Sequence, residues 1–364
     1  MKEERIRRVS RIRKSLFARG LDAALITGPE NRFYLSGFLA EDLGFTESAG
    51  ALLISKDRKI LLTDGRYETQ AREQSPDFDV VVYKKGLGPA LKRLFKDLGV
   101  EKCAYEPSFV SCSRLERLKK VALNVTWHHL GSIFEKMREI KAPGEYEMLK
   151  QAQKAAESVF QQVYQDIRPG MTEKEIAFMI LKGLYLEADG PSFPPIVASG
   201  PNSALPHAVP GDRKIQKGEA IIIDMGARLN GYCSDMTRTL FLGAPSRQFM
   251  QIYNTVKQAQ AKAQEAISPG MTGMEADGIA RKVIKEAGYG PYFVHSLGHG
   301  VGIAIHEAPG ISPRSRRKLR PGMVFTVEPG IYIPGQGGVR LENMGILDKN
   351  GLKIMTSEKW FYDF

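Results

Sequence analysis

Three of the six histidines in this 364-residue chain fall within one glycine-containing stretch, residues 295–307. Two pairs of acids lie on either side of that stretch: Asp224 and Asp235 before it, and Glu328 and Glu342 after it. Imidazole and carboxylate groups are common ligands of divalent metal ions. We therefore predict that one imidazole of the stretch and the four acids hold a pair of metal ions.

The first pair of acids is placed by a predicted β-hairpin. Residues 221–223 are all isoleucine, which is typical of a strand, and the Asn-Gly dipeptide at 230–231 is a strong signal for a two-residue turn. Such a turn pairs Gly226 with Asp235. Because side chains alternate along a strand, Asp224 shares the face of Gly226. Asp224 and Asp235 then become diagonal neighbours about 7–8 Å apart at the backbone. We expect Gly226 to leave room for an ion.

The second pair of acids needs a looser hairpin. Glu328 and Glu342 are separated by a segment that contains Pro334 and three glycines within 335–338. Their positions have equal parity, which allows both side chains to lie on one face. Glu328 follows the apolar run 324–327, and a carboxylate buried at the end of such a strand needs a partner. Clustered acids raise one another's pKa values, and divalent cations remove that conflict.

The ligand types also limit the chemistry of such a site. Oxygen donors with a single imidazole favour Mn²⁺, Co²⁺ or Zn²⁺ over a soft metal. Two ions lower the pKa of water and polarise a carbonyl, which suits the hydrolysis of amides or phosphate esters. A phosphoesterase would need more histidine ligands and a phosphate-binding nest, and neither is clear in the sequence.

An internal repeat indicates which elements carry these residues. Residues 167–172 (IRPGMT) reappear as 267–272 (ISPGMT), and in both copies the threonine suits the N-cap of a following helix. His207 and His306 occupy equivalent positions in the two copies, and so do the two acids of each half. We expect each half to supply two helices, a histidine and two acids on strands. Two such halves would form one domain with pseudo-twofold symmetry and a site on its axis.

The residues before the repeat show alternating helical and strand-like patterns. The predicted helices are 6–19, 89–98 and 111–121, and the predicted strands are 23–26, 51–54, 60–62 and 80–83. A turn signal at 141–144 precedes a long helical pattern over 145–166. We therefore expect an α/β layered N-terminal domain over 1–140 and a second domain over 141–364.

The composition is that of a soluble globular protein, with 43% hydrophobic and 26% charged residues. No apolar run approaches the roughly 18 residues of a membrane span. Three cysteines without metal-ligand spacing favour a reducing, cytoplasmic location. The net charge is +11, but the basic residues are spread out and accompany no nucleic-acid-binding motif. We expect neither a membrane nor a nucleic acid as a partner.

These motifs resemble those of the metallopeptidase family that contains prolidase, aminopeptidase P and methionine aminopeptidase, which has the pita-bread fold. The segments that carry the resemblance are 223–226 (IDMG), 232–238 (YCSDMTR), 295–307 (HSLGHGVGIAIHE), 327–332 (VEPGIY) and 339–342 (VRLE). The resemblance implies a mixed α/β (α+β) protein, with an α/β layered domain followed by a pseudo-twofold pita-bread domain. It implies five metal ligands: Asp224, Asp235, His299, Glu328 and Glu342. Asp235 and Glu342 would bridge both ions, with Asp224 on one and His299 and Glu328 on the other.

The resemblance also implies roles for residues around the ions. His207 and His306 would hydrogen-bond the substrate carbonyl and stabilise the tetrahedral oxyanion, and Glu328 would carry a proton to the leaving nitrogen. The positions that match substrate binding and pocket support are His295, Arg340 and Tyr332. A structural hydrogen bond is an alternative role for His295. Asn343 departs from the pattern, since an acid commonly follows the last ligand.

Within the family, methionine aminopeptidases lack an N-terminal domain and creatinase lacks the metal ligands, so the resemblance favours prolidase or aminopeptidase P. It implies an exopeptidase that hydrolyses the bond to proline nitrogen in Xaa-Pro dipeptides or N-terminal Xaa-Pro-Yaa peptides. The expected cofactors are two divalent ions, Mn²⁺ first, with Co²⁺ or Zn²⁺ as alternatives, and the expected assembly is a homodimer. Two other hypotheses stay open at this point: a catalytically silent binding protein on the same fold, and a metal-dependent hydrolase of a non-peptide C–N bond.

Overall fold

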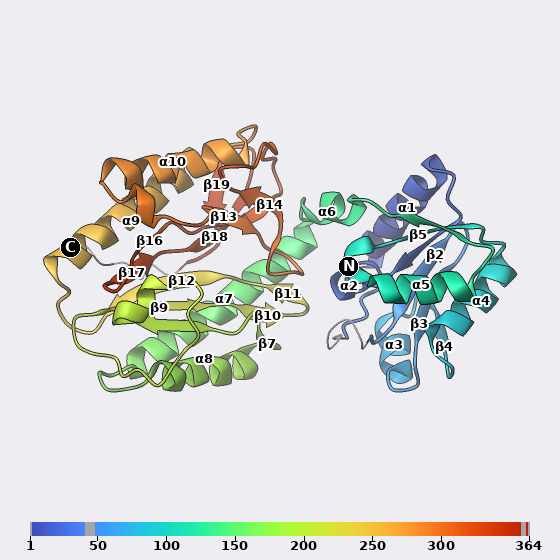
Figure 1. The fold of residues 1–364 in the computed structure, drawn as a ribbon, viewed down its shortest axis with the longest axis horizontal. Coiled ribbons are helices and arrows are strands. Elements are labelled where there is room, and N and C mark those ends of the chain that lie inside the picture. The colour runs from blue at the N-terminus through green and yellow to red at the C-terminus, as the bar shows by residue number, and fades with distance from the viewer. Residues whose placement is uncertain (1, 41–47, 358–361, 363–364) are drawn as a thin grey trace. The chain divides into compact units, whose positions relative to one another are not determined.

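The computed structural model describes residues 2–40, 48–357 and 362, and the chain divides into two compact units (Figure 1). The first unit is Met1–Met137 and the second is Arg138–Phe364. Among the described residues, no helix combines the length and the apolar character that crossing a membrane requires.

The first unit is built on one six-stranded sheet with strand order β4-β3-β2-β1-β5-β6. The β1–β2 and β2–β3 pairs are antiparallel, and the other three pairs are parallel. Its elements are α1 (Lys2–Ala18), β1 (Ala23–Ile26), α2 (Pro29–Ser36), β2 (Ala51–Ser55), β3 (Lys59–Thr63), α3 (Glu68–Gln74), β4 (Asp79–Val82), α4 (Leu87–Leu98), β5 (Lys102–Tyr105), η1 (Pro107–Phe109), α5 (Cys112–Val121), β6 (Thr126–His129) and α6 (Ile133–Arg138).

All seven helices and strands predicted before residue 140 are present, each within a few residues of its expected bounds. The sequence patterns do not predict α2, because its residues 31–36 are all buried and leave no polar face to give a helical period. The patterns also do not predict α3, β5, β6 and α6, which are all short elements.

The second unit consists of two similar halves. The elements of the first half are α7 (Pro143–Asp166), α8 (Glu173–Glu187), β7 (Gly190–Pro191), β8 (Ile196–Ser199), η2 (Gly200–Ala204), β9 (Ala220–Met225), β10 (Ala227–Leu229), β11 (Tyr232–Cys233) and β12 (Met236–Phe241). Those of the second half are α9 (Arg247–Ala266), α10 (Gly273–Glu286), η3 (Gly290–Tyr292), β13 (Gly298–Gly300), β14 (Glu307–Ile311), β15 (Val324–Val327), β16 (Gly330–Ile333), β17 (Gly337–Arg340), β18 (Asn343–Leu347) and β19 (Leu352–Ile354).

The repeat predicted from the two PGMT segments is confirmed in the backbone. Thr172 and Thr272 are the N-caps of α8 and α10, with the same φ of −84° and ψ of 157°. Each threonine accepts a bond from the N–H of a glutamate three residues later, Glu175 or Glu275, whose carboxylate bonds back to the threonine N–H. The same local sequence therefore builds the same helix start twice.

The helices of the second unit cover the outer faces of the strands. Figure 1 shows α9 and α10 on one side of the strands and α7 and α8 on the other. Apolar side chains of the helices bury against strands of their own half: Val159, Ile176 and Ile223 in the first half, and Val256, Ile284 and Phe325 in the second. Because Ile221 and Ile223 of β9 face the helices, alternation points Asp224 to the opposite side of the strand.

The predicted hairpin of the first half is confirmed. Leu229 pairs with Tyr232 across the turn, and Met225 pairs with Met236, so Gly226 falls opposite Asp235 as expected. The structure gives a reason for Gly226 that the sequence does not show, and the expectation that it leaves room for an ion stays a prediction. A Cβ atom at Gly226 would lie 1.9 Å from the carbonyl oxygen of Ser234. The glycine is required because the partner backbone passes too close for any side chain.

The hairpin of the second half runs through two strand pairs. Val327 pairs with Asn343 in β15–β18, and Gly330 pairs with Arg340 in β16–β17. Both pairs follow one register, which places Glu328 opposite Glu342. The strands are interrupted at these two glutamates, as they are at Gly226 and Asp235 in the first half. Asp235, Glu328 and Glu342 therefore lie where the ladders break, whereas Asp224 lies within β9.

Candidate metal centre

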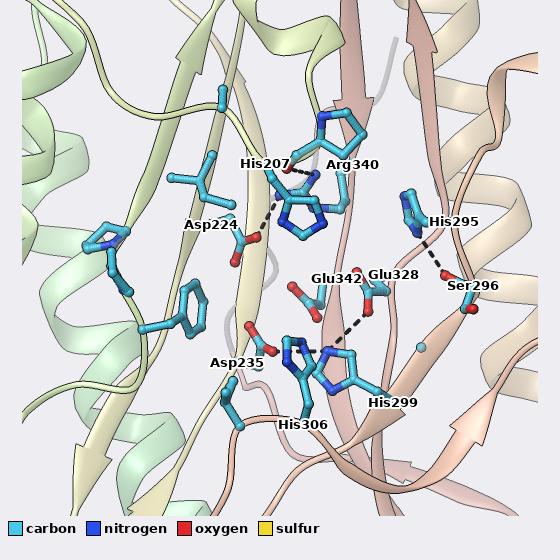
Figure 2. A pocket seen from close by; sticks show the side chains of 18 of the residues that line it. His207, Asp224, Asp235, His295, Ser296, His299, His306, Glu328, Arg340 and Glu342 are labelled. Carbon is cyan, nitrogen blue, oxygen red and sulfur yellow. Dashed lines mark hydrogen bonds and ion pairs between the residues drawn. The ribbon is translucent and has the colours of Figure 1, made fainter. Parts of the chain in front are cut away.

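The five residues expected to bind metal all line one cavity of about 660 Å³ in the second unit (Figure 2). They come from both halves: Asp224 in β9, Asp235 between β11 and β12, His299 in β13, Glu328 between β15 and β16, and Glu342 between β17 and β18. A cavity of this volume can hold a small peptide or a drug-sized ligand. The repeat thus brings together acids that are more than 100 positions apart in the chain.

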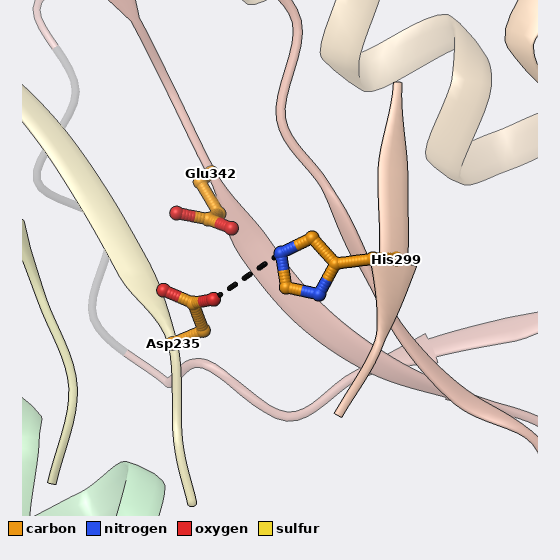
Figure 3. Close-up of side chains that lie close together, drawn as sticks. All are labelled: Asp235, His299 and Glu342. Carbon is orange, nitrogen blue, oxygen red and sulfur yellow. Dashed lines mark ion pairs between the residues drawn. The ribbon is translucent and has the colours of Figure 1, made fainter. Parts of the chain in front are cut away.

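Three of these side chains lie especially close together. One ligand atom from each of Asp235, His299 and Glu342 lies within 4.8 Å of the others (Figure 3). His299 Nε2 is 3.5 Å from Asp235 Oδ2 and 3.4 Å from Glu328 Oε1. A cation placed among these atoms would be in reach of donors from both halves of the unit.

The carboxylates of this cluster cannot all be charged in the protein alone. Burial raises the pKa of Asp235 well above its usual value, and the charges of Glu342, Asp224 and Glu328 raise it further. Burial and the charge of Glu328 raise the pKa of Glu342 in the same way. Burial raises the pKa of Glu328 to about 8, although the charge of Arg340 opposes this. A positive charge at the centre would relieve all three groups.

Two further observations test whether the residues fit a metal. Burial lowers the pKa of His299 to about 4, so the ring is neutral at pH 7. With its Nδ1–H donating to Gly300 O at 3.2 Å, His299 turns an Nε2 lone pair toward two carboxyl groups, and a proton or a cation must lie between these atoms. Asp224 Oδ1 is buried and has no hydrogen-bond partner in the described part of the chain. The donor set therefore fits divalent ions.

Arg340 organises the side of the cavity next to Asp224. The guanidinium is buried, and its Nη2 donates to Asp224 Oδ2 at 2.6 Å while its Nη1 donates to Tyr332 Oη at 2.8 Å. Tyr332 Oη lies 2.9 Å from His295 Nε2, and His295 Nδ1 lies 2.8 Å from Ser296 O. Burial would lower the pKa of Arg340, but Tyr332 and Asp224 outweigh it and raise the pKa. Arg340 is thus a fixed positive charge at the cavity wall.

The three residues expected to bind substrate therefore stand in different places. His295 and Arg340 line the cavity, and His295 also makes the structural hydrogen bond that was considered as its alternative role. Tyr332 does not line the cavity and instead supports Arg340 from behind. Burial raises the pKa of Tyr332 to about 12, so its hydroxyl stays protonated and can donate to the neutral ring of His295.

His207 and His306 both line the cavity and are exposed to it. The rings of His306 and His299 meet edge to face, with centroids 4.2 Å apart. Burial lowers the pKa of His306, and the nearby charge of His207 lowers it further. In Figure 2, His207 lies on the side of the carboxylates toward Arg340, and His306 lies on the side toward His299.

The buried carboxylate of Glu307 stabilises the loop that carries His306. Glu307 forms ion pairs with Arg138 and Lys141, and a Cβ on Gly302 would lie 2.2 Å from its Oε1. Burial would raise the pKa of Glu307, but these two cations outweigh it and lower the pKa. The carboxylate thus fills the inside of the loop and fixes its end beside His306.

Two threonines that the sequence analysis missed hold the acids in place. Thr237 Oγ1 donates to Glu342 Oε2 at 2.7 Å, and Thr326 Oγ1 donates to Glu328 Oε1 at 3.1 Å. Each threonine is two residues from an acid of the cluster, Asp235 or Glu328, and so shares its strand face. The period of two was available in the sequence and could have identified both threonines.

Asn343, the departure from the family pattern, contacts a buried arginine. Its Oδ1 accepts a bond from Arg238 Nη2 at 3.0 Å, while Arg238 Nη1 donates to Glu342 O at 2.6 Å. The amide oxygen therefore takes the place that a carboxylate would occupy, and the backbone at Glu342 is still tied to Arg238.

Known families match both parts of the chain. The model of metallopeptidase family M24 matches residues 147–349, and that of the creatinase/prolidase N-terminal domain matches residues 8–140. The chain is 37% identical to the Xaa-Pro dipeptidase of Pyrococcus furiosus over 352 residues, 96% of this chain and 97% of that one. The structure of an Xaa-Pro dipeptidase from Bacillus anthracis covers 98% of both chains with a TM-score of 0.91 and 39% identity. That of an X-Pro aminopeptidase from Thermotoga maritima covers 95% of this chain and 98% of its own, with a TM-score of 0.87 and 38% identity.

The fold and the carboxylate-lined cavity thus define a hydrolase of the metallopeptidase class with a pita-bread domain, as the resemblance implied. The chain belongs to metallopeptidase family M24, because the family model covers more than half of its length. Membership implies divalent metal ions as cofactors.

Proposed function

We propose that this protein is an exopeptidase that hydrolyses the peptide bond to a proline nitrogen, in Xaa-Pro dipeptides or at the N-terminus of Xaa-Pro-Yaa peptides. The observation that carries the proposal is the convergence of four carboxylates and a neutral imidazole in one cavity. Relatives of similar identity are named Xaa-Pro dipeptidase and X-Pro aminopeptidase, which supports both substrate lengths. A catalytically silent binding protein is not favoured, because all five expected ligand positions are retained.

Asp224, Asp235, His299, Glu328 and Glu342 would hold two divalent ions, with Mn²⁺ preferred and Co²⁺ or Zn²⁺ as alternatives because oxygen donors dominate the set. When bound, such ions lower the pKa of water and polarise the substrate carbonyl. Asp224 would bind through Oδ1, since Arg340 already holds Oδ2.

The protein's own groups would move the protons and hold the substrate. Glu328 Oε2, the oxygen that Thr326 does not hold, accepts a proton from water and returns it to the leaving proline nitrogen. His207 and His306 donate hydrogen bonds to the substrate carbonyl oxygen as negative charge develops on it. Arg340 and His295 line the wall and orient the peptide, with Tyr332 holding both.

The proposal also includes the domain boundaries, the oligomeric state and the cellular location. The two domains would be residues 1–140 and 141–364, and the protein would act as a homodimer in the cytoplasm. All three cysteines, Cys103, Cys112 and Cys233, are free, which suits a reducing compartment.

The test is a side-by-side assay of purified protein on an Xaa-Pro dipeptide and an Xaa-Pro-Yaa tripeptide, with Xaa-Ala peptides of the same lengths as controls. We expect hydrolysis of at least one proline peptide, loss of that activity after chelation, and its return with Mn²⁺ or Co²⁺. Metal analysis before and after chelation identifies the ions. Hydrolysis that persists in the metal-free protein, or equal rates on the alanine peptides, would contradict the proposal.

A further inference from the structure

Glu173, the first residue of α8, is a fully buried carboxylate outside the cavity. Its Oε1 accepts from the backbone N–H of Ser199 at 2.7 Å and from Ser199 Oγ at 2.8 Å. Its Oε2 accepts from the backbone N–H of Gly211 at 3.0 Å, and Asn202 Nδ2 lies 3.1 and 3.2 Å from the two oxygens. One side chain therefore binds both ends of residues 199–211, which we call the His207 segment.

The His207 segment forms one wall of the cavity. Its residues 206–210 line the cavity, and Pro206 O accepts a hydrogen bond from Arg340 Nη1 at 3.2 Å. Apart from Ser199 at the end of β8, its only regular element is the short η2 turn. Over the described ranges, no side chain makes a hydrogen bond to the ring of His207. The position of that ring is therefore set by the backbone of the segment. Glu173 holds that backbone near both ends, and Ser203 Oγ in between accepts a bond from Gly338 N–H at 2.8 Å.

In the second half of the unit, the equivalent histidine, His306, is held in place by different contacts. His306 directly precedes β14, which pairs with β13 and so is fixed by a sheet ladder to the strand that carries His299. The repeat places Gly273 where the first half has Glu173, and a Cβ there would lie 2.3 Å from Gly310 O. Both halves bond the start of the helix to this loop through backbone groups, and the first half adds the carboxylate of Glu173 to those bonds.

We propose that Glu173 is the positioning residue for His207, and that its carboxylate sets where the imidazole meets the substrate carbonyl. This inference rests on the proposed function. All of the groups that contact the carboxylate donate hydrogen bonds to it, so a glutamine at this position would turn an N–H₂ donor toward either the Ser199 end or the Gly211 end. One end of the segment would then be held less tightly, although Ser199 would still pair with Ile221 in the β8–β9 ladder and Gly211 O would still accept a bond from Lys174 N–H.

The activity test is a double-mutant cycle with Glu173→Gln and His207→Ala. We expect Glu173→Gln to lower kcat/KM on the proline peptide by about 10- to 100-fold with unchanged metal content, since small misplacements of a reacting group have effects of that size. In the His207→Ala background the same change should cost less than about twofold. Equal losses in the two backgrounds would show that Glu173 acts independently of His207 and would overturn the proposal.

The control is Glu175→Gln, the same chemical change two residues further along α8. Glu175 bonds only to Thr172 in the exposed helix cap and does not contact the His207 segment. We expect this variant to keep kcat/KM within about twofold of the wild-type value, because losing one exposed cap contact affects only helix stability. A loss as large as that of Glu173→Gln would assign the effect to the helix start and would also overturn the proposal.

Hydrogen exchange gives a readout that needs no substrate. Backbone amides of peptides covering 199–211 should exchange faster in Glu173→Gln than in the wild type and in Glu175→Gln, since their hydrogen-bond acceptor is weakened. Unchanged exchange would overturn the proposal. If the wild-type protein had no peptidase activity, the proposed function would be refuted. Hydrogen exchange would still test whether Glu173 holds the His207 segment. If Glu173→Gln does not fold, Asn202→Ala removes one of the same bonds and should give the same pattern at smaller size.

Discussion

Metal binding to this protein should release protons, because the carboxylates of the cluster are protonated when no cation is present. The pKa of Glu328 is raised to about 8 by burial, and those of Asp235 and Glu342 are raised well above their usual values. Ligands must lose their protons to bind a metal. The metal-free protein at neutral pH therefore holds protons that the metal-bound protein does not.

The size of the effect follows from the pKa of Glu328. A group with a pKa of about 8 is about 90% protonated at pH 7, so Glu328 alone releases about 0.9 proton when metal binds. Asp235 and Glu342 bring the upper limit to about three. At pH 9.5 the contribution of Glu328 falls to about 0.03 proton. The release should therefore decrease as the pH rises.

The measurement is titration calorimetry of the chelated protein with Mn²⁺ at pH 7 in several buffers of different ionisation enthalpy. The slope of the observed enthalpy against the buffer enthalpy gives the number of protons released. We expect a value between about one and three. Glu328→Gln provides the control, and its slope should be smaller by at least about 0.9, because the charge of Glu328 also raises the pKa values of Asp235 and Glu342. A slope of zero for the wild type would refute the reasoning about this cluster.

Three further predictions concern the same unit. Asp235→Ala should lose bound metal and more than about 100-fold of its hydrolysis of proline peptides, as metal analysis and rates would show. Gly226→Ala should lower the free energy of unfolding by at least about 2 kcal/mol, because the new methyl group would clash with the carbonyl oxygen of Ser234. Gly278→Ala is the control on an open face of α10, and it should raise the free energy of unfolding by about 0.5–1 kcal/mol. Chelated protein should lose thermal stability as the pH rises from 4.5 to about 8, because the folded protein holds the proton of Glu328 more tightly than the unfolded chain does. Metal-loaded protein should not lose stability over this range.

The parts of the site that local rules determine were predictable. The Asn-Gly turn and the alternation of side chains gave the register that places Gly226 opposite Asp235. The repeat of the PGMT segment gave two helix pairs with equivalent caps. These features depend on residues within one hairpin or one helix start, and the sequence displays such neighbours directly.

The contacts that bring distant segments together were not predictable. The bond from Arg340 to Asp224 and the bonds from Glu173 to residues 199–211 join positions far apart in the chain, and no periodicity reports them. Gly226 shows the other limit, since the sequence indicates that a glycine lies opposite Asp235 but does not show that the backbone of Ser234 passes too close for a side chain. Packing against a particular neighbour becomes visible only once the fold is known.

The ion pairs of Glu307 decide where the protein can be cut into fragments. A fragment that began at Pro143 would keep every residue of the cavity wall but would lose Arg138 and Lys141, leaving a buried anion beside His306 at a cost of about 3–5 kcal/mol. It would also remove Glu139, the partner of Arg317 and Arg320. A truncated protein should therefore begin upstream of Arg138. Residues 138–142, which precede α7, belong with the second unit.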